Sequence, residues 1–80
     1  MQSAFNSSVF GKVLLAVEQT VHAKMPGLSP SILLADDLAL GRLGRLRLAM
    51  CLEQIFDVEL QDDVVERFGN VGDIVRYFRN

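Results

Sequence analysis

The sequence lacks the residues that cross-link small folds. It holds one cysteine, Cys51, so no intramolecular disulfide can form. Because Cys51 lies within an apolar run, we expect a small buried side chain in a reducing compartment. The single histidine, His22, and Cys51 have no partners at the spacing of metal ligands. We therefore expect no metal site.

Long apolar runs are also missing. No segment approaches the roughly 20 apolar residues that cross a bilayer, and the polar start, Met1 to Ser3, lacks the basic residues of a signal peptide. We expect a cytoplasmic protein with no membrane insertion. The net charge of -2, from 8 basic and 10 acidic residues, gives no general electrostatic reason to bind nucleic acid.

Apolar residues, in contrast, are abundant. They make up 50% of the 80 residues, which supplies one hydrophobic core and leaves too little chain for a second. We expect one domain over residues 1–80, monomeric when free and folded without metal or cofactor.

Apolar residues recur at helical spacing in four segments. Valines at every fourth position from Val9 to Val21 predict a helix over about 5–23, and an unbroken stretch predicts a second over 41–56. Asp62 and Asp63 suit the start of a brief third helix, and Asn70 is a good N-cap for a last one. The expected core includes Val13, Val17, Leu48, Leu52, Phe56, Val65, Ile74 and Phe78.

The second helix carries two apolar faces. One, with Leu48, Leu52 and Phe56, suits the core. The other has Leu43, Leu46 and Met50, flanked by Arg42 and Arg47. We favour packing of this stripe beneath the long loop over 26–40, and contact with a partner is the alternative. The adjacent Asp36 and Asp37 in that loop could be paired catalytic acids, but a structural or capping role is favoured, because no nucleophile accompanies them.

The residues from Leu28 to Phe78 resemble the acyl carrier protein family at matching spacing. The similar stretches are Leu28, Ser29 and Pro30; Asp36 to Leu40; the apolar positions of 43–56; Asp57 to Leu60 with Asp62; and Val71, Gly72, Asp73, Ile74 and Tyr77. The resemblance implies an all-α four-helix bundle with a long loop between its first two helices and a short third helix. It also implies a non-enzymatic module that docks on enzymes of fatty-acid, polyketide or related acyl biosynthesis.

The sequence departs from the family at its attachment site. The family's Asp-Ser-Leu triplet, whose serine carries phosphopantetheine, corresponds here to Gly41, Arg42 and Leu43. Arginine has no hydroxyl, so we expect no phosphopantetheine at Arg42 and an interaction or regulatory subunit instead. The alternatives are a genuine acyl carrier with another mode of attachment, and a helical adaptor outside acyl metabolism.

The start of the second helix also differs in charge. The family usually presents acidic residues there, whereas this chain has Arg42, Arg45 and Arg47 before its first acid, Glu53. The arginines form either a docking site for an acidic protein or phosphate, or a solvated face. The partner-binding residues predicted on this basis are Arg42, Leu43, Arg45, Leu46, Arg47 and Met50.

Overall fold

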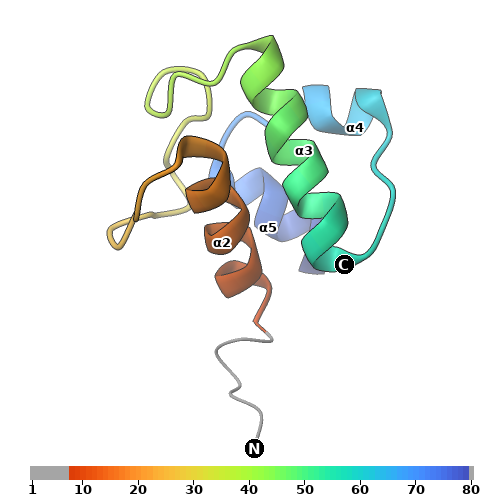
Figure 1. The fold of residues 1–80 in the computed structure, drawn as a ribbon, viewed down its shortest axis with the longest axis horizontal. Helices are drawn as coiled ribbons and strands as arrows, with labels where there is room; N and C mark the ends of the chain where they lie inside the picture. Colours follow the sequence, from red (N-terminus) through yellow and green to blue (C-terminus); the bar gives the residue numbers. More distant parts are fainter. Residues whose placement is uncertain (1–7, 80) are drawn as a thin grey trace, which may run out of the picture.

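The computed structural model describes residues 8–79, and this part of the chain is built from helices (Figure 1). The order is the one expected from the sequence, with a long loop after the first helix and a short third helix. The helices are α2 (Val9–Val21), α3 (Arg42–Phe56), α4 (Asp62–Glu66) and α5 (Val71–Arg79). In Figure 1, α2 and α3 lie side by side, α5 lies against α2, and α4 lies beside the first half of α3. No helix within residues 8–79 is both long and apolar enough to cross a membrane.

The first helix is shorter than predicted. The expected start near Phe5 lies outside the described residues, and α2 begins after Ser8, whose hydroxyl accepts a hydrogen bond from the Gly11 amide at 2.9 Å. Such a side-chain cap satisfies an amide that the first turn leaves unpaired. The helix ends at Val21, because His22 adopts a left-handed conformation with φ of 59° and its amide donates to the Glu18 carbonyl.

The long loop is held against α5 by its backbone. The amides of Val71 and Gly72 donate to the carbonyls of Ile32 and Pro30, at 3.0 and 2.8 Å, and the Leu34 amide donates to the Gly69 carbonyl at 3.0 Å. A Cβ at Gly72 would lie 3.2 Å from the Pro30 oxygen, so this close approach suits glycine. The loop therefore packs onto the bundle, as its scattered leucines predict.

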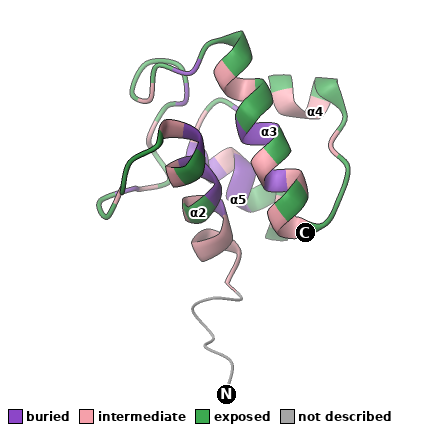
Figure 2. Ribbon diagram, in the orientation of Figure 1, coloured by how far each residue is buried: buried purple, intermediate pink, exposed green. Residues whose placement is uncertain are grey.

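The core lies between α2, α3, α5 and the loop (Figure 2). Five of the residues predicted for it are buried: Val13, Val17, Leu48, Leu52 and Ile74. The loop adds Leu28, Leu34 and Leu40, and the end of the chain adds Phe68, Val71 and Val75.

Three predicted core residues, Phe56, Val65 and Phe78, are only partly buried. Val65 belongs to the short α4, which packs against α3 at the edge of the domain. The rings of Phe56 and Phe78 stack with centroids 3.9 Å apart, and the Lys12 ammonium lies 5.3 Å from the Phe56 centroid. Helical spacing identifies an inward face, but how deeply each residue is buried depends on which elements cover it.

A reciprocal cap starts α5, as predicted from Asn70. The Asp73 amide donates to Oδ1 of Asn70 at 2.8 Å, and Oδ2 of Asp73 accepts from the amides of Gly69 and Asn70 at 2.8 and 3.1 Å. The bond from Gly69 does most to lower the pKa of the Asp73 carboxyl. Partial burial opposes this effect, whereas the bond from Asn70 and the charge of Arg76 add to the lowering.

We predict that truncating Leu52 to Ala destabilises the domain by about 2 to 5 kcal/mol, because its side chain is wholly buried. Phe56→Ala should cost less than the roughly 3 to 5 kcal/mol typical of a buried Phe, because Phe56 is only partly buried. Urea unfolding of both variants, followed by circular dichroism, measures the difference. A larger loss in Phe56→Ala than in Leu52→Ala would contradict this description of the core.

We predict that Asp73→Asn lowers the melting temperature more at pH 7 than at pH 3. Because the folded-state pKa of Asp73 is lowered, its contribution to stability is present above the unfolded value, near 3.9, and is lost as the pH falls through the folded pKa. The gap between wild type and variant should therefore close on acidification. Asp63→Asn is the control, because Asp63 makes only an exposed ion pair with Arg67. A gap that is independent of pH would refute the proposed role of the carboxylate.

Candidate functional site

The triplet that the resemblance aligns with the attachment site opens α3 in the structure. Gly41 is the N-cap, and its carbonyl accepts from the Arg45 amide at 2.9 Å. Arg42 is the first residue of the helix and is exposed. The structure thus places Arg42 at the start of this helix, where the resemblance places the family's serine.

The three arginines predicted for the site have different surroundings. Arg42 and Arg47 are exposed. The guanidinium of Arg45 instead reaches α4, where Nη1 donates to the carbonyl oxygens of Val65, at 3.3 Å, and Phe68, at 2.6 Å. These carbonyls lie at and just beyond the end of α4, where carbonyl oxygens attract a cation. Arg45 therefore holds α4 against α3, a contact that no motif in the sequence indicates.

The apolar stripe of α3 does not pack beneath the loop, so the interpretation favoured from the sequence is wrong. Leu43 is 72% exposed, Leu46 49% and Met50 61%. The reason is that the loop is bonded to the start of α5 and turns Leu28, Leu34 and Leu40 into the core. These side chains, with the two exposed arginines, form one surface that we call the α3 patch: Arg42, Leu43, Leu46, Arg47 and Met50.

The approach of the loop to α3 depends on two small residues. Ala39 has a φ of 56°, a left-handed conformation that costs a residue with a Cβ about 1 to 2 kcal/mol. A Cβ at Gly44 would lie only 2.9 Å from Cδ2 of Leu40, so the absence of a side chain there lets Leu40 enter the core. Together these residues turn the loop sharply before Gly41 and leave the start of α3 facing solvent.

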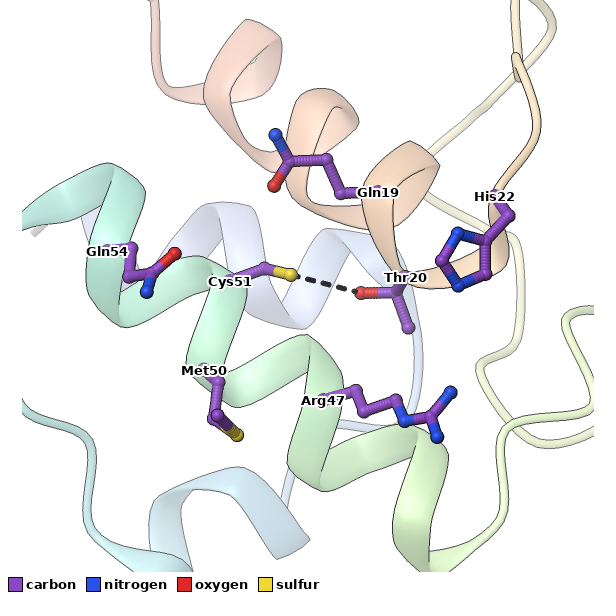
Figure 3. Close-up of a pocket in the computed structure, with 7 residues that line it drawn as sticks. All are labelled: Gln19, Thr20, His22, Arg47, Met50, Cys51 and Gln54. Atoms are coloured by element: carbon purple, nitrogen blue, oxygen red, sulfur yellow. Dashed lines mark hydrogen bonds between the residues drawn. The ribbon is translucent and has the colours of Figure 1, made fainter.

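The α3 patch is bordered by two grooves. The groove toward α4 has a volume of about 230 Å³ and is lined by Arg42, Arg45, Leu46, Asp62, Val65 and Glu66. The groove toward α2, shown in Figure 3, has a volume of about 310 Å³ and is lined by Gln19, Thr20, His22, Arg47, Met50, Cys51 and Gln54.

Cys51 is not the core residue that the sequence predicted. It is partly buried, and Figure 3 shows its sulfur pointing toward Thr20 across the α2–α3 groove. The Thr20 hydroxyl lies 3.8 Å from the sulfur and 2.8 Å from the Ala16 carbonyl oxygen, to which it donates. His22 is exposed at the end of α2, and residues 8–79 contain no cluster of three His, Cys, Asp or Glu that could hold a metal ion.

Of the two loop aspartates, Asp37 bonds to the backbone of its own loop. Oδ2 of Asp37 accepts from the Leu33 amide at 2.8 Å, and the amide of Asp37 donates to the Leu33 carbonyl at 3.1 Å. This local ring closes a turn. Asp36 is exposed beside it. The structural role predicted from the sequence is confirmed for Asp37.

Comparison with known proteins supports the resemblance, although no family model matches the chain. An acyl carrier protein of Clostridium acetobutylicum is 41% identical over 44 residues, which are 55% of this chain and 57% of that protein. Acyl carrier proteins of Helicobacter pylori strains J99 and G27 are 26% and 27% identical over 73 residues. Each of these two matches covers 91% of this chain and 94% of the relative.

The Clostridium match thus spans little more than half of its relative, whereas the Helicobacter matches span almost all of theirs. All three relatives are named as carriers and not as enzymes. Residue pattern, helix order and these matches agree that this chain is similar to acyl carrier proteins.

Proposed function

We propose that this module docks on enzymes of fatty-acid, polyketide or related acyl biosynthesis as an interaction or regulatory subunit, without phosphopantetheine. The observation that supports this proposal is the α3 patch itself. Three large apolar side chains are exposed beside two arginines, on the helix that Arg42 opens in place of a serine.

The residues at the start of α3 do not fit a phosphopantetheine attachment. The phosphodiester needs a hydroxyl oxygen, and the Arg42 guanidinium offers none. The last serines in the chain, Ser29 and Ser31, lie in the loop with their hydroxyls 3.1 Å apart, next to the segment that is bonded to α5. The hydroxyl of Thr20, the chain's only threonine, donates to a carbonyl within α2.

Apolar exposure favours a docking role for the patch. Isolated surface leucines are common, but Leu43, Leu46 and Met50 follow one another at helical spacing on a single face of α3. An amphipathic helix that binds in a groove of another protein commonly does so through three or four apolar side chains at this spacing. Burial of these side chains supplies affinity.

The charge of the patch indicates an acidic partner. Arg42 and Arg47 lie in the first turns of α3, where cations oppose the helix dipole by about 0.3 to 1 kcal/mol each. Among the described residues neither arginine forms an ion pair. The two charges therefore do not stabilise the helix and are available to a carboxylate-bearing surface.

We propose the cytoplasm as the location, because a single unpaired cysteine suits a reducing compartment.

The rival function is a genuine acyl carrier with a different mode of attachment. We predict that incubation with coenzyme A and a broad-range phosphopantetheinyl transferase adds no mass to the protein, because position 42 has no hydroxyl. Intact-mass spectrometry measures this directly. The double variant Gly41→Asp, Arg42→Ser restores the family's triplet and tests whether the rest of the chain still allows attachment of phosphopantetheine. A gain of the mass of phosphopantetheine by the wild type would favour a genuine acyl carrier.

We predict that Arg42→Glu with Arg47→Glu weakens partner binding roughly tenfold and removes most of its salt dependence, because both charges would then repel an acidic surface. Partners captured from an extract of the source cells with the wild type are identified by mass spectrometry and then titrated individually. Arg45 is left intact, because a substitution there would remove its hydrogen bonds to α4. A loss of binding could then result from a change in the fold.

Arg79→Glu is the matched control, because Arg79 is exposed and is the last residue of α5, a helix that lies away from the start of α3 in Figure 1. Its binding should equal that of the wild type. If the folded double variant bound as tightly as the control, Arg42 and Arg47 would form only a solvated face and the proposed docking role would fail.

A further inference from the structure

The α2–α3 groove continues from the α3 patch. Arg47 and Met50 belong to both, so a partner that covers the patch reaches the edge of the groove. Figure 3 shows Cys51 and Gln54 farther along α3, with Gln19 and Thr20 on the α2 side and His22 just after the end of α2. The patch therefore extends in one direction into a concave surface between two helices.

Charge distinguishes this groove from the one on the other side of the patch. The α3–α4 groove is lined by two carboxylates, Asp62 and Glu66. It also holds Arg42 and Arg45, but the Arg45 guanidinium already donates to backbone carbonyls. An acidic segment placed there would meet two like charges and one free arginine, which is unfavourable.

The α2–α3 groove carries no carboxylate among its lining residues. Its formal charge at neutral pH is the single positive charge of Arg47. Met50 and Cys51 supply apolar surface, and the amides of Gln19 and Gln54 can donate or accept hydrogen bonds. Its volume of about 310 Å³ is at the small end of ligand sites, which suits one or two side chains of a peptide.

The hollow that adjoins the groove along α2 does not change this charge balance. It is lined in part by Glu18 and Lys24, whose charges are opposite. A carboxylate oxygen of Glu18 also accepts from the Met25 amide at 2.8 Å.

We propose that the partner segment is an acidic amphipathic helix that lies across the α3 patch and into the α2–α3 groove. One of its carboxylates pairs with Arg47, and an apolar side chain covers Met50 and Cys51. This inference rests on the proposed docking function, and it adds the side of α3 on which the partner lies and the chemistry of the segment.

Two synthetic peptides test the proposal on the intact domain. One is an amphipathic helix of about 15 residues with a leucine stripe flanked by glutamates, and its twin carries lysine at every glutamate position. Each is titrated to about 1 mM into the isotope-labelled domain, and the amide NMR signals are followed. The acidic peptide should shift the signals of Gln19, His22, Arg47 and Gln54, and the basic twin should not.

Shifts centred on Asp62 and Glu66 would overturn the choice of groove. Equal shifts with both peptides, or none with either, would overturn an acidic partner. Cys51 gives a second measurement, because it is the chain's one cysteine. The acidic peptide should slow its alkylation by iodoacetamide, and an unchanged rate would contradict occupation of the groove.

Paired variants separate this inference from the docking function. Gln19→Glu with Gln54→Glu adds two carboxylates to the groove with little change of shape and should weaken binding of the acidic peptide about fivefold. Asp62→Asn with Glu66→Gln is the control and should change it less than twofold. Circular dichroism confirms folding of each variant.

The outcomes are distinct. If Arg42→Glu weakens binding but Gln19→Glu with Gln54→Glu does not, docking on the α3 patch stands and the groove assignment fails. If neither set of variants matters, the docking function fails as well.

Discussion

The backbone pairing between the loop and the start of α5 determines which surfaces this module exposes. The bonds from Leu34, Val71 and Gly72 hold residues 30–34 against α5, so the apolar side chains of the loop close the core from that side. The loop cannot then cover the outer face of α3. The exposed patch is thus a consequence of how the core is closed, and the glycine at 72 that permits the close approach contributes to it.

One arginine of α3 serves the fold, whereas the other two remain available. Arg45 satisfies carbonyl oxygens at the end of α4, a helix too short to be stable without tertiary contacts. Arg42 and Arg47 lie on either side of it along the sequence and project into solvent. Residue type and spacing therefore do not distinguish an arginine that supports the fold from one that is exposed to a partner. The distinction depends on whether another element, here α4, lies within reach of the guanidinium.

The sequence predicts local features well and tertiary ones less well. Valine spacing, the Asn70 cap and the acidic start of α4 located the helices, because each is determined within a few residues. The exposure of Leu43 and the partial burial of Phe56 depend on segments distant in the chain, so periodicity could not assign them. The left-handed Ala39 carried no signal, because residues other than glycine rarely adopt that conformation.

The two components of the α3 patch would contribute differently to the proposed docking. Burying a leucine or methionine side chain fully is worth about 1.5 to 3 kcal/mol, so Leu43, Leu46 and Met50 can offset a substantial part of the cost of association. Such apolar contact does not discriminate between partners. Exposed arginines add little affinity, but they speed encounter with acidic surfaces and reject basic ones. A change of charge on the exposed face of α3 would therefore change which partners the proposed docking surface accepts without disturbing the buried core.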